Sequence, residues 1–140
     1  MQLSTLLQPL HGSGTILVVD DEAVMRATAA AILEDLGYVM LLADNGRTGL
    51  ELFREKWNEI DLVLLDMIMP EMNGRDCFAA MKEIDPDARI ILSSGFTRSD
   101  DLADLREAGL AGFIRKPYRS VALSQIVASA LITDSKDSDL

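Results

Sequence analysis

The sequence predicts an α/β protein built on a five-stranded parallel sheet with helices on both faces. Short runs rich in Val, Ile and Leu alternate with longer amphipathic stretches, and this alternation is typical of repeated βα units. The short runs are apolar throughout, which indicates strands buried on both sides. With 140 residues, 49% of them hydrophobic and 26% charged, the chain has the size and composition of one globular domain.

The predicted elements follow one another as five βα units, and right-handed crossovers would place their helices on both faces of the sheet. Strands are expected at residues 15–19, 38–43, 60–65, 89–93 and 112–115. Helices are expected at residues 22–36, 46–57, 74–84, 99–108 and 120–131.

Boundary residues justify the ends of these helices. Gly37 can adopt the left-handed backbone conformation that ends the first helix, and Asn45 can cap the second. Pro86 stops the third helix because proline has no amide hydrogen to donate. Ser99, which two aspartates follow, and Ser120 are expected to cap the last two helices.

The two ends of the chain lack this pattern. Residues 1–14 are predicted to be a linker, because Pro9 interrupts any helix and glycine and serine precede the first strand. His11 is interpreted as a flexible linker residue, since no acidic or second histidine neighbour could activate it. Residues 15–132 form the predicted domain, and residues 133–140 a frayed polar tail.

Composition argues against several classes of function. The net charge of −10 would repel a phosphate backbone, so direct nucleic-acid binding is not expected. No apolar run reaches the roughly 20 residues of a membrane span, and no signal peptide is recognisable. We therefore expect a cytoplasmic location. Cys77 is the only cysteine, so it cannot form an internal disulfide, and it is predicted to be a buried packing residue.

Polar side chains stand where the predicted strands end. Asp20 and Asp21 follow the first strand, Asp66 the third, Ser94 the fourth and Lys116 the fifth. If the first and third strands are neighbours, these groups converge at the carboxyl edge of the sheet. Three carboxylates repel one another unless a cation lies among them, and Mg²⁺ prefers such oxygen ligands. A carboxylate in such a site can also attack phosphorus.

Four motifs that carry these residues resemble the receiver domain of two-component response regulators. They are Val18-Val19-Asp20-Asp21-Glu22, the run from Leu64 to Gly74 (LLDMIMPEMNG), Ser94-Gly95 and Lys116-Pro117. The similarity covers about residues 15–132, and the stretch from Asp66 to Gly74 is its most specific part. The resemblance implies a flavodoxin-like fold with strand order 2-1-3-4-5. It also implies a phosphoryl group received from a histidine kinase or a histidine phosphotransfer domain.

The resemblance implies a role for each matching acidic position. Asp66 would be the phosphoacceptor. Asp21, Asp66 and the backbone carbonyl of Ile68 would bind Mg²⁺ directly, whereas Asp20 would act largely through water. Such a domain would catalyse its own phosphorylation and a slow dephosphorylation.

The resemblance also implies a conformational switch. Ser94 would donate its hydroxyl to the phosphoryl group, Lys116 would pair with that group, and Phe113 would turn inward in response. The Lys116-Pro117 bond would be cis, a geometry with a low conformational energy only before proline. Gly74 would allow a sharp turn into the third helix.

Two bulky apolar residues predict a long-lived phosphorylated state. Ile68 and Phe96 stand two positions after Asp66 and Ser94, where the resemblance places side chains that flank the attacking water. Neither can hold a water by hydrogen bonding, so hydrolysis is expected to be slow.

Rival interpretations fit the residues less well. A flavodoxin-like FMN protein needs a phosphate cradle after the first strand, where this chain has Asp20 and Asp21. A haloacid-dehalogenase-type phosphatase needs an aspartate at position 68, which is Ile68. An alternative from a different functional class is a protein-interaction module that has the same fold but acts independently of phosphorylation. The wider context is expected to be the C-terminal receiver of a hybrid sensor histidine kinase, with a stand-alone regulator as the second choice.

Overall fold

The computed structural model describes residues 8–95 and 102–132, which form a parallel sheet with order β2-β1-β3-β4-β5. The strands are β1 (Thr15–Val19), β2 (Val39–Ala43), β3 (Leu62–Asp66), β4 (Ile90–Ser94) and β5 (Gly112–Arg115). The helices are α2 (Ala23–Asp35), α3 (Gly46–Lys56), α4 (Gly74–Ile84), α5 (Ala103–Glu107) and α6 (Ser120–Ile132). The predicted fold class and strand order are both confirmed.

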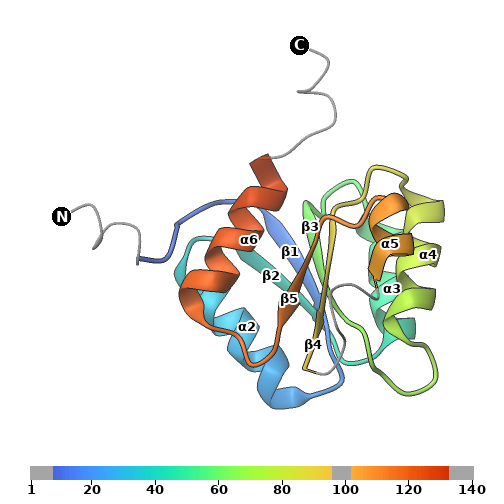
Figure 1. The fold of residues 1–140 in the computed structure, drawn as a ribbon, viewed down its shortest axis with the longest axis horizontal. Coiled ribbons are helices and arrows are strands. Elements are labelled where there is room, and N and C mark those ends of the chain that lie inside the picture. The colour runs from blue at the N-terminus through green and yellow to red at the C-terminus, as the bar shows by residue number, and fades with distance from the viewer. Residues whose placement is uncertain (1–7, 96–101, 133–140) are drawn as a thin grey trace, which may run out of the picture.

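Two separate hydrophobic cores form because alternate residues of each strand point to opposite faces. One core packs against α3, α4 and α5 and contains Leu17, Val63 and Leu65. The other packs against α2 and α6 and contains Ile16 and Leu64. Figure 1 shows the resulting three layers, with α2 and α6 on one side of the sheet and the remaining helices on the other.

Most predicted boundaries agree with the structure to within one or two residues. Asn45 caps α3 as predicted, because its Oδ1 accepts a hydrogen bond of 2.8 Å from the amide of Thr48. Gly37, with φ of 111°, follows the end of α2. The described part of the fourth predicted helix runs over Ala103–Glu107, and its predicted cap at Ser99 lies outside the described residues.

Strands β3 and β4 each continue one residue beyond the prediction. Asp66 pairs in register with Ser93, and Ser94 pairs with Arg115, so Asp66 and Ser94 are the last residues of their strands. The hydrogen-bonded ladder therefore extends into the polar residues, because burial at the end of the sheet favours pairing of their backbone groups.

The last part of the predicted linker lies against the domain. The amide of Leu10 donates to Ser124 Oγ (3.0 Å), and the amide of Gly12 donates to the carbonyl of Leu36 (2.9 Å). His11 is exposed. Residues 8–14 are thus held by hydrogen bonds to α6 and to the end of α2, which differs from the flexibility expected from their composition.

Two further expectations concern side chains and helix length. Cys77 is fully buried as predicted, and burial raises the pKa of its thiol to about 12. Among the described residues, no helix has the length and apolarity that crossing a membrane requires.

Candidate functional site

A pocket of about 420 Å³ opens at the carboxyl edge of the sheet. Its lining combines acidic, basic and hydroxyl groups with three apolar side chains: Asp21, Glu22, Met25, Asp66, Ile68, Ser94, Gly95, Lys116 and Pro117. Parallel strands present the ends of β1, β3, β4 and β5 at one edge, which explains why residues far apart in the sequence meet here.

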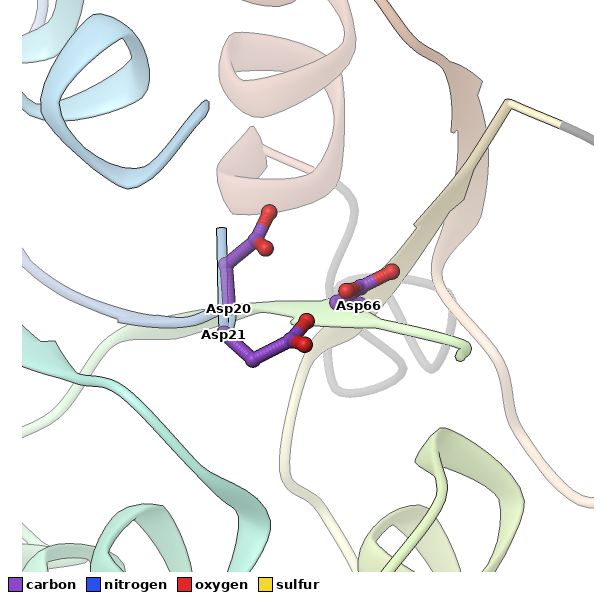
Figure 2. Close-up of side chains that lie close together, drawn as sticks. All are labelled: Asp20, Asp21 and Asp66. Carbon is purple, nitrogen blue, oxygen red and sulfur yellow. The ribbon is translucent and has the colours of Figure 1, made fainter. Parts of the chain in front are cut away.

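Three aspartates converge at this edge. One carboxylate oxygen from each of Asp20, Asp21 and Asp66 lies within 4.8 Å of the other two, and Figure 2 shows the three side chains grouped where β1 and β3 end. Asp20 is 1% exposed and Asp66 is 3% exposed, whereas Asp21 is exposed. The convergence expected for neighbouring first and third strands is therefore present.

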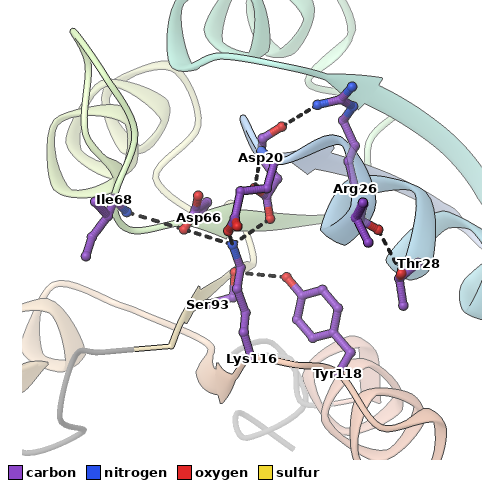
Figure 3. Close-up of polar contacts among 10 residues, drawn as sticks. Asp20, Arg26, Thr28, Asp66, Ile68, Ser93, Lys116 and Tyr118 are labelled. Atoms are coloured by element: carbon purple, nitrogen blue, oxygen red, sulfur yellow. Dashed lines mark hydrogen bonds and ion pairs between the residues drawn. The ribbon is translucent and has the colours of Figure 1, made fainter.

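Lys116 places an ammonium group among these carboxylates. Its Nζ lies 2.8 Å from Asp20 Oδ2, 3.0 Å from Glu22 Oε1 and 3.3 Å from Asp66 Oδ1. Figure 3 shows Lys116 reaching up between Asp20 and Asp66. The Lys116-Pro117 bond is cis, as the resemblance implied.

Backbone contacts fix the two buried carboxylates. The amide of Glu22 donates to Asp20 Oδ1 at 2.9 Å, and Arg26 Nη1 donates to the carbonyl of Asp20 at 2.8 Å. The amide of Ile68 donates to Asp66 Oδ1 at 3.3 Å. Both aspartates are thus oriented before any ligand binds, which limits the reorganisation that binding requires.

Burial and charge shift the proton affinities of the central pair. Burial, together with the nearby Asp20 carboxylate, raises the pKa of Asp66 to about 7, although Lys116 opposes that shift. Burial alone would lower the pKa of Lys116, but the carboxylates of Asp20, Glu22 and Asp66 outweigh it and raise that pKa above its ordinary value. Lys116 is therefore cationic at neutral pH.

The residues present fit a divalent cation. The three converging groups offer only carboxylate oxygens, the donor type that Mg²⁺ takes. Asp20 Oδ2 is fully buried and accepts no hydrogen bond within the described residues. Among those residues, the ion pair with Lys116 at 2.8 Å is the contact that offsets its negative charge. A buried anionic oxygen of this kind costs stability unless a cation neutralises it.

Gly74 is required at this site for close approach rather than for a special backbone angle. Its amide donates to the carbonyl of Met67 at 2.8 Å, and a Cβ added to it would lie 2.6 Å from the carbonyl oxygen of Asp66 and from Met67 Cα. The resemblance implied that Gly74 allows a sharp turn into this helix, and the structure adds a packing reason. The helix α4 begins directly against the backbone of Asp66 and Met67 at the end of β3.

The expected switch residues lie on one face of the sheet. Ser94 is 1% exposed, and Phe113 is half-buried against the core that faces α3 and α4. Phe113 is in register with Leu92, two residues before Ser94. Because residues i and i+2 of a strand share a face, the Ser94 and Phe113 side chains lie on the same face of neighbouring strands, in diagonal positions.

The two residues expected to control hydrolysis differ in what the structure describes. Ile68 lines the pocket and is 58% exposed, so it is a solvent-accessible apolar residue at the site. Phe96 lies outside the described residues.

Two features of the site were missed from the sequence. The sequence indicates Glu22 only as part of a motif and as the start of a helix, yet its carboxylate pairs with Lys116, 94 positions away. Tyr118 donates a buried hydrogen bond of 3.0 Å to Ser93 Oγ. The third consecutive acid after the first strand was the available signal for Glu22, but only the fold reveals its partner.

Comparison with known proteins identifies the family of this chain. The family described as "Response regulator receiver domain" matches residues 16–128, which is most of the chain. The chain therefore belongs to the response regulator receiver domain family of two-component systems.

Three similar proteins illustrate the range of this family. The chemotaxis protein CheY of Bacillus subtilis is 36% identical over 83% of this chain and 96% of its own length. The sensor kinase CckA of Brucella abortus is 32% identical over 87% of this chain, which spans only 13% of that protein. The CheX-CheY-BeF₃-Mg²⁺ complex of Borrelia burgdorferi has a TM-score of 0.82 at 27% identity, covering 86% of this chain and 90% of that one.

Proposed function

We propose that this receiver domain accepts a phosphoryl group on Asp66 in a Mg²⁺-dependent phosphorelay reaction, with a histidine kinase or histidine phosphotransfer domain as the donor. The observation that carries the proposal is the combination of three carboxylates within 4.8 Å of one another and an ammonium group 3.3 Å from Asp66. A cation and an anion can be bound side by side in such a site.

Asp66 has the properties of the nucleophile. A carboxylate oxygen of Asp66 would attack the phosphorus of a phosphohistidine, the P–O bond would form as the P–N bond breaks, and the electron pair would leave on the imidazole nitrogen. Asp20, Asp21 and Asp66, with the backbone carbonyl of Ile68, would hold Mg²⁺, which when bound supplies positive charge for the phosphoryl oxygens. Lys116 would offset further negative charge on those oxygens.

The pocket opening suits a protein donor. Three apolar side chains, Met25, Ile68 and Pro117, line it beside the acidic groups, and Val24, in the first turn of α2, is 72% exposed. An apolar surface around a reactive polar centre is typical of a docking site. The likeness to the CckA sensor kinase supports a histidine kinase partner and a place within a hybrid kinase, with a stand-alone regulator as the alternative.

Phosphorylation would then be read out through Ser94 and Phe113. Ser94 ends β4 beside Asp66, so its hydroxyl can bond a phosphoryl oxygen there. Movement of Ser94 would open space on the face that it shares with Phe113, whose ring would turn inward. The charge added at Asp66 would thus change side-chain packing on the surface formed by α5 and β5.

Labelling with acetyl phosphate tests the proposed function. Intact mass should show one added phosphate when Mg²⁺ is present and none after EDTA treatment, because the donor is an anion entering an acidic pocket. Asp66→Asn should abolish the addition. If the folded parent binds neither phosphate nor beryllofluoride with Mg²⁺, the result favours a phosphorylation-independent interaction module instead.

A further inference from the structure

We propose that Glu22 holds Lys116 in the unphosphorylated protein and that the phosphoryl group must displace it, so that Glu22 limits the rate of phosphorylation. The inference rests on the proposed function and adds a positioning residue to it. It comes from the number of partners that Lys116 has and from the unequal burial of those partners.

The ammonium group of Lys116 has three carboxylates around it in this structure. A lysine ammonium has three N–H donors, and three carboxylates lie within reach: Asp20 at 2.8 Å, Glu22 at 3.0 Å and Asp66 at 3.3 Å. The contact with Glu22 is also a hydrogen bond, whereas Asp20 Oδ2 accepts none. An incoming phosphoryl oxygen therefore competes with these carboxylates for Lys116, and the hydrogen bond to Glu22 is the one that it must replace.

Glu22 is the partner that can leave at the lowest cost. Its side chain is 62% exposed, whereas the side chains of Asp20 and Asp66 are 2% and 4% exposed. Water can solvate the carboxylate of Glu22 after release, and exposed ion pairs contribute little to stability. A buried carboxylate that lost the ammonium would keep an uncompensated charge.

The backbone around Glu22 permits this release without unfolding the helix. Glu22 is the N-cap residue of α2, but its side chain makes no capping hydrogen bond. Its backbone holds the position instead: the amide donates to Asp20 Oδ1 at 2.9 Å, and the carbonyl accepts from the amide of Arg26 at 2.9 Å. The side chain is thus free to exchange Lys116 for water.

The pair also bridges the pocket. Glu22 follows β1 and Lys116 follows β5, and both line the same opening. The hydrogen bond of 3.0 Å between them joins these two sides in the unphosphorylated protein. We infer that phosphorylation transfers one lysine donor from Glu22 to a phosphoryl oxygen, which breaks this bridge.

The test compares Glu22→Gln with Glu51→Gln, a control that removes one charge from an exposed position on α3. The rate of Mg²⁺-dependent labelling by acetyl phosphate should rise roughly two- to fivefold in Glu22→Gln, the range that an exposed ion pair allows. The affinity for beryllofluoride with Mg²⁺ should rise by a similar factor. Both gains should shrink in high salt, which screens the pair in the parent protein.

A cycle with Lys116→Ala separates loss of the lysine partner from a general loss of negative charge. Beryllofluoride affinity should respond to Glu22→Gln only when Lys116 is present. An equal gain in the Lys116→Ala background, or a Glu22→Gln variant that reacts no faster than Glu51→Gln, overturns the inference and leaves the proposed function intact. Failure of the parent to be labelled at all overturns both.

Discussion

The hydroxyl of Tyr118 donates a buried hydrogen bond of 3.0 Å to Ser93 Oγ and so joins the segment after Lys116 to strand β4 beside Asp66. Burial raises the pKa of the Tyr118 hydroxyl to about 12, so it stays protonated as a donor. We expect Tyr118→Phe to lower the free energy of unfolding by about 1–2 kcal/mol, because the bond is lost inside the protein. Urea unfolding measures this.

Tyr38→Phe is the matched control for that change. Tyr38 is also buried, but its hydroxyl makes no hydrogen bond within the described part of the chain. Its loss should therefore cost less than that of the Tyr118 hydroxyl. Equal costs for the two variants would show that the bond to Ser93 contributes nothing.

Gly74→Ala should destabilise the domain by roughly 2–4 kcal/mol. The added methyl group would lie 2.6 Å from the backbone of Asp66 and Met67, which cannot move aside as a flexible side chain could. Gly95→Ala is the control, since a Cβ there meets nothing within 4 Å. Chemical denaturation of both variants measures the difference, and equal midpoints would exclude a tight contact at Gly74.

Asp66→Asn should stabilise the metal-free domain at neutral and higher pH. The pKa of Asp66 rises from 3.8 to about 7 on folding, so the folded state binds more protons than the unfolded state between these values. The free energy of unfolding therefore falls as pH rises through this window. Asparagine does not titrate, so the variant does not lose free energy of unfolding in this window. We expect it to be about 1–3 kcal/mol more stable than the parent at pH 8.

The measurement is thermal or urea unfolding from pH 4 to pH 8 in buffer with EDTA. The stability difference between Asp66→Asn and the parent should grow across that range and level off above it. A constant difference would mean that the proton affinity of Asp66 does not change on folding.

The phosphorylated state should decay faster once Ile68 is made polar. Ile68 is 58% exposed at the pocket opening and cannot hold a water molecule by hydrogen bonding. We expect Ile68→Asn to speed the loss of phosphate by roughly tenfold, about 1.4 kcal/mol of barrier. Phe96→Glu should act in the same direction at the second position implied by the resemblance.

Val39→Asn is the control for this decay experiment. Val39 is a similarly exposed apolar residue, but it is the first residue of β2 and so lies at the edge of the sheet opposite the pocket. The readout is the decay of added mass after removal of the phosphodonor. Parent-like decay in both Ile68→Asn and Phe96→Glu would show that these side chains do not govern water access.

The sequence predicted the fold well because its information is local. Alternation of apolar and amphipathic runs indicated five βα units, and single residues such as Asn45 and Gly37 marked helix ends through backbone chemistry. Strand order is not encoded in periodicity and came from the family resemblance. The extension of β3 to Asp66 was missed because a charged residue rarely continues a buried strand.

The site was predictable to the extent that each group follows a strand. That rule brought Asp20, Asp66 and Lys116 together correctly. The Glu22-Lys116 pair depends on side-chain reach between two loops, which no sequence spacing specifies. The hydrogen bonds of residues 8–14 were missed for a similar reason, since composition indicates flexibility but not the acceptor at Ser124.

Chemical mapping of the acyl phosphate tests the central claim most directly. After labelling with acetyl phosphate and Mg²⁺, borohydride reduction converts a phosphorylated aspartate to homoserine, which peptide mass spectrometry can locate. The proposed function requires homoserine at position 66 and unmodified Asp20 and Asp21 in the same sample. Homoserine at position 20 or 21, or its absence from every peptide of a protein that gained phosphate, would contradict the assignment of Asp66 as the phosphoacceptor.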